Sequence, residues 1–215
     1  MDGPPIAARG LRRNWSGRPV LAGLDLVVEP GELVALYGAN GAGKSTLLRV
    51  LGTLLRPTGG ELRLFGCDVR RGTIAARQRL GWVGHDTACY PDLTGRENLE
   101  FHASLHGLAR AGARVDALLA WAGLEGAART PVRSYSRGMA QRLTLARALV
   151  HEPALLLFDE PFSGLDTEFA ARLAALLAEH CERGGAAIVS AHDDSRLAAI
   201  ASRTVTLVAG RLREG

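Results

Sequence analysis

The chain has 215 residues, 47% of them hydrophobic and 22% charged, which is long enough for one domain with a sizeable buried core. Its formal net charge is +4, and because Lys44 is the only lysine, nearly all of the positive charge is arginine. These arginines are dispersed and lack interleaved aromatic residues, which argues against a nucleic-acid partner. No apolar run approaches the roughly 20 residues that span a bilayer.

The amino terminus, Met1–Pro5, has neither the basic start nor the apolar core of a signal peptide. We therefore expect the protein to stay in the cytosol. Any role at a membrane would then come through a partner.

The first third of the chain predicts strands arranged around one glycine-rich loop. Residues Ile6–Asn14 read as a strand, and Leu24–Val28 alternates like a half-buried strand. An apolar run, Leu33–Tyr37, leads through the loop into a helical stretch, Leu47–Leu51. Three further elements are expected beyond it: a strand at Glu61–Phe65, a helix at Thr73–Arg79 and a strand at Leu80–Val83.

The loop between the apolar run and the helix predicts a phosphate-binding site. Its residues are Gly38, Ala39, Asn40, Gly41, Ala42, Gly43, Lys44, Ser45 and Thr46. Glycines let successive backbone N–H groups point inward, and the following helix adds the positive end of its dipole. Lys44 would reach the β- and γ-phosphates of a nucleotide, and the Ser45 hydroxyl would bind Mg²⁺. A turn that merely caps a helix does not explain Gly-Lys-Ser in this context.

The middle of the chain is expected to be mainly helical, from about residue 86 to 145. Thr94 and Glu97 have the spacing of a capping box that opens a helix through Leu105, and Arg114–Ala122 has a second helical period. From Ala154 strands and helices alternate again: strand 155–158, helix 167–181, strand 186–190, helix 195–201 and strand 204–208. This alternation predicts a parallel sheet with helices on both faces.

Two carboxylates, Asp159 and Glu160, end the apolar strand Leu155–Phe158. Asp159 would meet the metal, and Glu160 could polarise a water aimed at the γ-phosphate. Asp-Glu after a strand is also a common helix-start signal. The phosphate-binding loop upstream favours the functional interpretation.

Four later segments together make the sequence resemble the ATP-binding subunits of ABC transporters over nearly its whole length. Residues 135–139 with 141–149 are similar to the signature motif and its helix, 163–166 to the D-loop, and 190–193 to the switch-histidine segment. The resemblance implies an α/β P-loop NTPase of the ABC type. Its mainly parallel sheet is flanked by helices, with an N-terminal antiparallel β portion and an inserted helical subdomain. Residues 1–215 would form one ABC domain, with a RecA-like core at 1–85 and 146–215 and the helical subdomain at about 86–145.

The same resemblance implies a site shared between two copies of the chain. In a head-to-tail dimer, Ser136 and Gly138 of one copy would contact the ATP that the other copy holds with Mg²⁺. His192 would contact the γ-phosphate and position the attacking water. Asp166 would couple the conformations of the two sites. Integral membrane transporter subunits are the further partners implied, with the chain attached peripherally at the cytoplasmic face of the cell membrane.

Trp15 lies where the family places an aromatic side chain that stacks on adenine. Stacking of this kind is worth on the order of 1 kcal/mol. The alternative is a tryptophan at the solvent edge that packs on a neighbouring arginine.

Two positions depart from the family pattern. Arg137 and Met139 replace the third and fifth residues of the usual signature motif, although Ser136 and Gly138 remain. His85 stands where most members carry a glutamine that senses Mg²⁺ and the lytic water. Neutral imidazole can bind a metal or hydrogen-bond to water, so we expect His85 to keep that role, the alternative being a spacer without it.

The Gly84-His85 pair, the short chain and the variant signature motif are similar to one subfamily, the ATP-binding subunits of the heme exporter used in cytochrome c maturation. The alternative within the class is the ATPase subunit of another exporter, for a drug, a lipid or another small molecule. A non-transport ABC ATPase of DNA repair or translation would carry long coiled coils or two nucleotide domains. A subunit that binds nucleotide without hydrolysis is disfavoured by Lys44, Asp159, Glu160 and His192.

Overall fold

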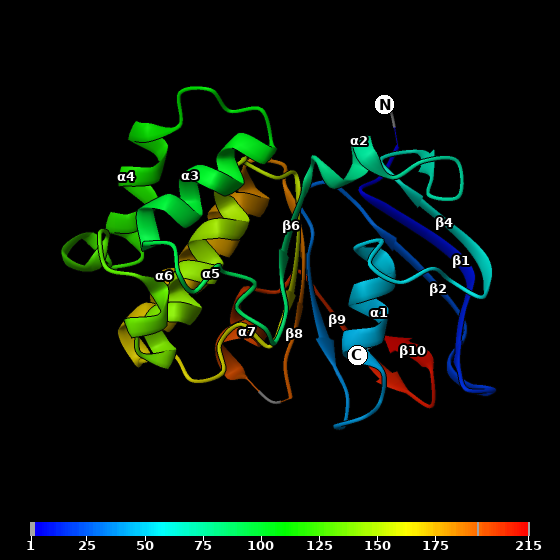
Figure 1. The fold of residues 1–215 in the computed structure, drawn as a ribbon. Coiled ribbons are helices and arrows are strands. Elements are labelled where there is room, and N and C mark those ends of the chain that lie inside the picture. The colour runs from blue at the N-terminus through cyan, green and yellow to red at the C-terminus, as the bar shows by residue number, and fades with distance from the viewer. Residues whose placement is uncertain (1–2, 193, 215) are drawn as a thin grey trace.

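Two β-sheets form the frame of the protein, which the computed structural model describes over residues 3–192 and 194–214 (Figure 1). The smaller sheet has four antiparallel strands in the order β2-β1-β4-β5. Its strands are β1 (Ile6–Trp15), β2 (Arg18–Val28), β4 (Gly59–Leu64) and β5 (Cys67–Asp68). The half-buried strand predicted at residues 24–28 is thus the second half of a longer one, and the antiparallel portion implied by the resemblance is confirmed.

The larger sheet has six strands in the order β10-β9-β3-β8-β7-β6. They are β3 (Leu33–Tyr37), β6 (Leu80–Val83), β7 (Leu155–Asp159), β8 (Ala186–Ser190), β9 (Arg203–Val208) and β10 (Arg211–Glu214). All neighbours pair in parallel except β10, which pairs antiparallel with β9. β8 therefore lies between β3 and β7, and the carboxyl ends of these three strands share one edge, where open α/β sheets bind ligands.

The central strands of the larger sheet, β3, β7 and β8, are buried on both faces, as their apolar sequences predict. Leu155 and Leu157 of β7 pack with the antiparallel sheet and helix α1 (Lys44–Leu51), whereas Leu156 and Phe158 pack with the helices on the other face. Figure 1 shows α1 between the two sheets. The phosphate-binding loop is thereby held by a helix that is enclosed in the core.

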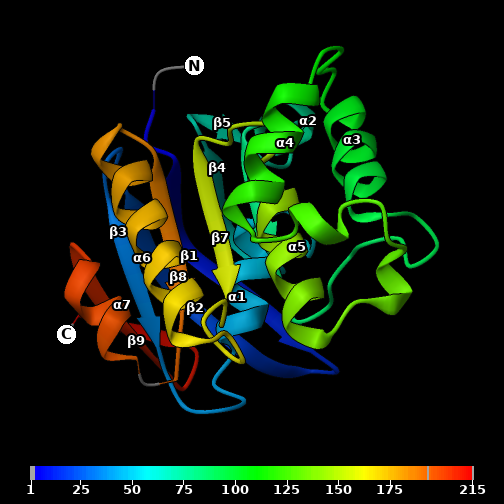
Figure 2. The same cartoon turned by 90° about the vertical axis from the view of Figure 1, so that its left-hand side faces the viewer.

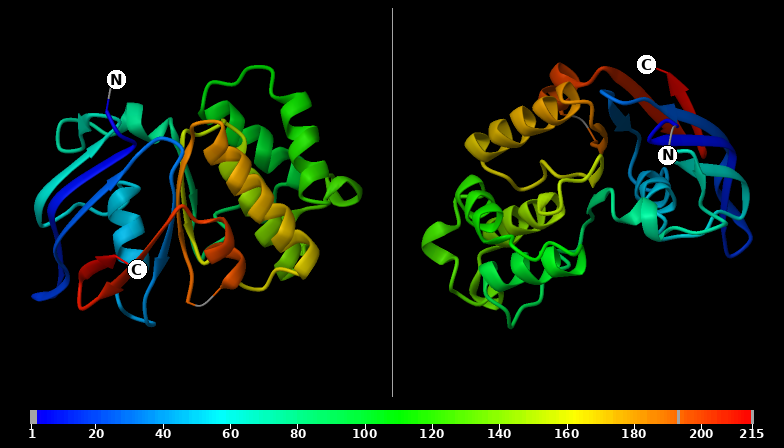
Figure 3. Two further views of the ribbon diagram at one scale, coloured as in Figure 1. Left: turned by 180° about the vertical axis from the view of Figure 1, so that it is seen from behind. Right: turned by 90° about the horizontal axis from the view of Figure 1, so that it is seen from above.

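The remaining helices lie on the side of the larger sheet away from the antiparallel sheet, except for the single turn α2 (Figures 2 and 3). They are α2 (Ile74–Arg77), α3 (Gly95–Leu105), α4 (Gly112–Trp121), α5 (Arg137–Leu149), α6 (Thr167–Glu182) and α7 (Ser195–Ile200), with 3₁₀ turns at Glu125–Ala127 and Val132–Ser134. α3 and α4 form the protruding helical part with the start of α5. α5 then continues through Leu149, across the predicted boundary near residue 145, and packs against β6.

Besides the longer β2, three elements differ from the prediction, and one of them is the two-residue strand β5, which was not predicted. The helix expected at residues 73–79 is one turn, which ends at the C-cap Gln78, and Arg79 leads into β6. β10 was not predicted. It pairs with β9 through a two-residue hairpin at Ala209 and Gly210, whose φ angles of 48° and 73° suit such a turn.

The capping box that opens α3 is confirmed. The Thr94 hydroxyl accepts a hydrogen bond from the Glu97 N–H at 3.2 Å, and the Glu97 carboxylate accepts one from the Thr94 N–H at 2.8 Å. One turn later Asn98, 2% exposed, holds the incoming loop through the N–H and carbonyl of Tyr90. The start of α3 is thus fixed by hydrogen bonds between residues that lie at most eight positions apart in the chain.

We expect Thr94→Ala to lower the free energy of unfolding by about 1 kcal/mol, because the Glu97 N–H in the first turn of α3 loses its acceptor. Urea denaturation measures the change. Thr94→Ser keeps the hydroxyl and should stay close to the parent protein. Equal stability of the alanine and serine variants would contradict this account of the cap.

Candidate active site

The phosphate-binding loop leaves β3 and enters α1 in a conformation that requires glycine at two positions. Gly38 has a φ of 151° and Gly43 a φ of 105°, both in the region that favours glycine. A Cβ on Gly38 would lie 2.7 Å from the Leu207 carbonyl oxygen, and one on Gly43 would lie 2.9 Å from Val20. Gly43 also caps α1 without a side-chain acceptor, so the first N–H groups of the helix are free for an anion.

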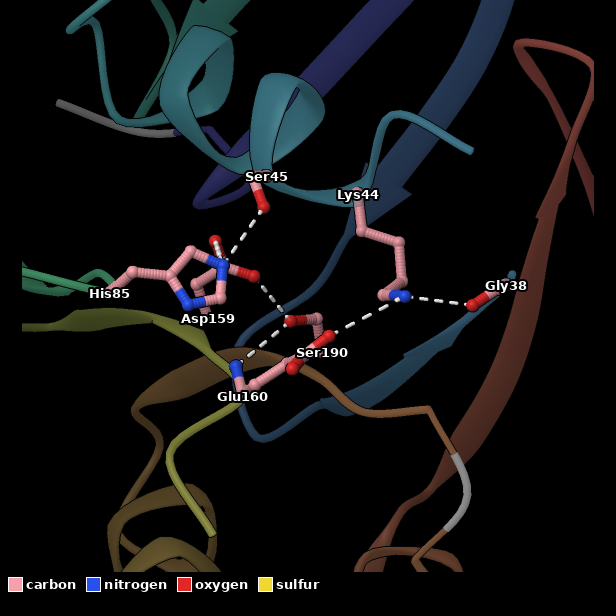
Figure 4. A network of polar contacts seen from close by, with 7 residues as sticks. All are labelled: Gly38, Lys44, Ser45, His85, Asp159, Glu160 and Ser190. Atoms are coloured by element: carbon pink, nitrogen blue, oxygen red, sulfur yellow. Dashed lines mark hydrogen bonds and ion pairs between the residues drawn. The ribbon is translucent and has the colours of Figure 1, made fainter. Parts of the chain in front are cut away.

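Lys44 points back along the loop toward the end of β7 (Figure 4). It is 5% exposed, and its Nζ donates to the Gly38 carbonyl oxygen at 2.7 Å. The same Nζ lies 3.5 Å from Glu160 Oε1. The ammonium group of the chain's single lysine is thus placed between the loop and a carboxylate, where a phosphate group would meet it.

Asp159 is the last residue of β7, and only one of its two carboxylate oxygens accepts a hydrogen bond. Its Oδ1 accepts from Ser190 Oγ at 2.7 Å. Its Oδ2 is buried and has no hydrogen-bond partner among the described residues, although the His85 Nε2 lies 3.4 Å away. A buried carboxylate oxygen without a donor is costly, and a cation would satisfy it.

The Ser45 hydroxyl is a second oxygen ligand candidate, and it lies on the other side of His85 from Asp159. Its Oγ lies 3.5 Å from His85 Nε2, so the imidazole stands between the serine hydroxyl and the Asp159 carboxylate (Figure 4). Hydroxyl and carboxylate oxygens are ligands that Mg²⁺ prefers, so these residues fit that ion. The sequence predicted Ser45, Asp159 and His85 as residues at a Mg²⁺ site, and the fold brings these three side chains together.

Glu160 follows Asp159 with a φ of 52°, an uncommon conformation for a residue other than glycine. Its N–H donates to Ser190 Oγ at 3.0 Å. Because the same hydroxyl donates to Asp159, one fully buried serine at the end of β8 orients both carboxylates. The Glu160 side chain turns toward Lys44 and is 29% exposed.

Ser190 and Gln141 are site residues that the sequence prediction did not assign. Gln141 donates from Nε2 to the carbonyl oxygens of Pro161 (3.0 Å) and Ser163 (2.7 Å), which ties α5 to the segment after Glu160. A cavity of about 100 Å³ adjoins this contact, with Arg137, His85 and Glu160 also in its lining. Ser190 is a polar residue at the end of an apolar strand, and this pattern could have indicated a site residue. Only the strand order brings it to Asp159.

Three other predicted site residues lie at the ends of helices or strands. Ser136 is the N-cap of α5, Asp166 the N-cap of α6, and His192 is exposed just after β8. A Cβ on Gly138 would meet nothing within 4 Å, so the backbone there is open to approach.

Trp15 ends β1 with 60% of its surface exposed and the Arg13 guanidinium 5.8 Å from its ring centre. This contact agrees with the alternative interpretation of the sequence, in which the tryptophan packs on a neighbouring arginine. The exposed ring nevertheless leaves room for stacking.

Comparison with known proteins gives a consistent result. Residues 21–163 match the family described as ABC transporter. A "Cytochrome c biogenesis ATP-binding export protein CcmA" from Cupriavidus necator is 44% identical over 191 residues, 89% of this chain and 84% of the relative. The protein of that name from Salmonella typhi is 39% identical over 205 residues, 95% and 98% of the two chains. "Daunorubicin resistance ATP-binding protein DrrA3" from Streptomyces coeruleorubidus is 45% identical over 163 residues, 75% of this chain and 52% of that one.

Two solved structures share the fold. "Structure of ATP binding subunit of ABC transporter" has a TM-score of 0.91 at 29% identity and covers 98% of this chain and 89% of its own. "Dimeric structure of a post-hydrolysis state of the ATP-binding cassette MJ0796 bound to ADP and Pi" has a TM-score of 0.85 at 25% identity and covers 97% and 98%. Within residues 3–192 and 194–214, no helix has the length and apolarity needed to cross a membrane.

We expect Ser190→Ala to lower ATP turnover about 10- to 100-fold, the usual cost of losing a group that orients a metal-binding carboxylate. Steady-state phosphate release measures it. The matched control is Ser202→Ala, because the Ser202 hydroxyl also makes two hydrogen bonds at a strand end, to the N–H and carbonyl of Leu33 at the opposite edge of the sheet. Equal losses of turnover in the two variants would show that Ser190 acts on stability alone.

Proposed function

The chain belongs to the ABC transporter family as an ATP-hydrolysing protein, and from that premise we propose that it powers heme export for cytochrome c biogenesis through separate membrane subunits. The observation that carries this proposal is that cytochrome c biogenesis export proteins from several bacteria are 38–44% identical to it over most of both chains. The Gly84-His85 pair supports the same subfamily. We place the protein at the cytoplasmic face of the cell membrane, held there by those subunits.

We propose that the loop amides and Lys44 bind the β- and γ-phosphates of ATP. Lys44 is supported by its burial and by its position between the Gly38 carbonyl and Glu160. Ser45 and Asp159 would hold Mg²⁺, which neutralises phosphate charge when bound. Glu160 would orient the attacking water, since its carboxylate lies beside Lys44 and its backbone is held by Ser190.

His85 is proposed to replace the glutamine usual in the family. Its Nε2 lies 3.4 Å from Asp159 Oδ2 and 3.5 Å from Ser45 Oγ, within reach of both proposed metal ligands. Thr144 of α5 donates to the Thr87 carbonyl at 2.8 Å and so holds the segment that carries His85. The imidazole would thereby report the state of the nucleotide to the helical part of the chain.

A second copy of the chain is proposed to complete the site. Ser136 and Gly138 at the N-terminus of α5 would contact the γ-phosphate held by the partner copy, with the N–H groups of the first turn as donors. The open backbone at Gly138 and the dimeric state of a structural neighbour, the ATP-binding cassette MJ0796, support this arrangement. Exposed His192 and Trp15 would contact the γ-phosphate and adenine, and Asp166 would transmit geometry across the interface.

A second candidate is export of another small molecule. It is favoured by the daunorubicin-resistance relative, whose identity of 45% is slightly above the 38–44% of the cytochrome c biogenesis relatives, although this chain covers only 52% of it. The nucleotide site would work in the same way in both cases. The two candidates differ in the membrane subunits and in the cargo.

Complementation distinguishes the two candidates. We expect this chain, expressed with its cognate membrane subunits, to restore c-type cytochromes in a bacterium that lacks its own cytochrome c biogenesis ATP-binding protein, as measured by heme staining. Glu160→Gln should bind ATP but lower turnover by at least about 100-fold and fail to restore cytochromes. Gain of drug tolerance without cytochromes would instead favour the second candidate.

The role of His85 is tested on ATP hydrolysis. We expect His85→Ala to lower both basal and partner-stimulated turnover about 10- to 100-fold, whereas His85→Gln retains most of it, because glutamine can reach the same ligands. The exposed neighbour Asp86 offers a control, and Asp86→Ala should hydrolyse ATP at the parent rate. Unchanged turnover in His85→Ala would rule out the sensing role.

A further inference from the structure

Three histidines meet in a cluster that takes no part in the nucleotide site. His102 lies in the last turn of α3, His106 is the C-cap residue of that helix, and His151 follows the end of α5. One ring nitrogen of each lies within 4.8 Å of the others. The rings of His106 and His151 are stacked with centroids 3.7 Å apart, and His102 lies 4.9 Å from His106 and 5.7 Å from His151.

The hydrogen bond of His151 determines which of its nitrogens carries the proton. Its Nε2 lies 2.9 Å from the Leu80 carbonyl oxygen, which can only accept, so Nε2 carries the hydrogen. Nδ1 is then left with a lone pair. This atom is buried and has no hydrogen-bond partner in the part of the chain that the structure describes. Metal-binding histidines commonly have this arrangement, with the second ring nitrogen donating to a backbone carbonyl.

The surroundings of the cluster keep the imidazoles neutral, which is the form that binds a metal. Burial, with Arg147 and the other two rings, lowers the pKa of His102 to about 3. Burial, with His106 and Arg147, lowers the pKa of His151 to about 4, although the hydrogen bond to the Leu80 carbonyl acts to raise it. Burial is also the main reason that the pKa of His106 is lowered.

We propose that His102, His106 and His151 form a binding site for a transition metal ion of the zinc type. Three imidazoles suit Zn²⁺, Cu²⁺ or Ni²⁺. Mg²⁺ and Ca²⁺ are disfavoured, because both prefer oxygen ligands and the three histidines offer none.

A path for entry lies beside the cluster. His102 and His106 open onto a groove of about 380 Å³ that Trp82 and Leu105 also line. This groove gives the ion access and leaves space for a water or another group in the fourth position. Coordination would draw the nitrogens to roughly 3.4 Å of one another, so His106 must turn out of its stack with His151.

The site is connected to the nucleotide-binding edge through one strand. His151 bonds to Leu80, the first residue of β6, and His85 follows two residues after the last residue of β6. Arg147, which faces the cluster, reaches the Trp82 carbonyl in the same strand at 3.5 Å. Binding at the cluster would therefore act on the strand that leads to His85.

The test titrates the metal-free full chain with Zn²⁺ by calorimetry and with Co²⁺ by visible absorption. We expect one ion per chain and the intense visible bands of four-coordinate Co²⁺. His106→Gln and His151→Gln should each weaken binding by at least about 100-fold. The matched control is His180→Gln, which removes another half-buried histidine with its Nε2 against a backbone carbonyl, that of Ala186 at 3.3 Å, and it should bind as the parent does.

Two further measurements separate this site from binding elsewhere and from misfolding. Asp159→Asn removes the buried carboxylate of the nucleotide site and should leave Zn²⁺ affinity unchanged. In ¹⁵N spectra of the folded parent chain, Zn²⁺ should shift His151 Nδ1 and leave Nε2 protonated. Absence of Zn²⁺ binding, or equal affinity in the His106, His151 and His180 variants, would overturn the proposal and leave a packed cluster of neutral imidazoles.

Discussion

One buried hydrogen bond, from Ser190 Oγ to Asp159 Oδ1, joins the two strands on which the nucleotide site depends. Asp159 and Ser190 are paired residues in the parallel register of β7 and β8, and β8 is also the neighbour of β3, which leads into the phosphate-binding loop. A buried carboxylate without donors costs several kcal/mol. The serine hydroxyl removes part of that cost and, by accepting from the Glu160 N–H, sets the direction of the second carboxylate. The remaining unsatisfied oxygen of Asp159 is what makes the site receptive to a cation.

Helix α5 connects this edge of the sheet to the protruding helical part. Its N-cap Ser136 is exposed, and Gln141, one turn further on, holds the segment after Glu160. Thr144 holds the segment after His85, and Arg147 reaches β6. These contacts lie on successive turns of one helix, so the segment after Glu160 and the segment after His85 are both bonded to the helix that would present Ser136 to a partner copy.

The histidine cluster occupies the other end of β6, where α3 and the end of α5 meet. Its composition differs from that of the nucleotide site: three neutral imidazoles and a guanidinium at one end of the strand, and oxygen ligands with a lysine at the other. Each chemistry suits a different ion, so the two sites would not compete for the same metal. Their shared strand gives them a physical connection of four residues.

The sequence by itself determined the features that depend on neighbours in the chain. The glycines and lysine of residues 38–46, the capping box at Thr94 and the apolar strand before Asp159 are local patterns, and they predicted the loop, the start of α3 and β7. The combined motifs also identified the family. Such features are legible because backbone conformation, capping and side-chain periodicity act over a few residues.

Only the tertiary structure decided what lies against what. The order β3-β8-β7 brought Ser190 to Asp159, the course of β6 placed His85 between Ser45 and Asp159, and the meeting of α3 with the end of α5 assembled the three histidines. β10 also escaped the sequence patterns. These outcomes depend on the burial of apolar faces from distant segments, and no periodicity within one segment specifies which partner will cover it.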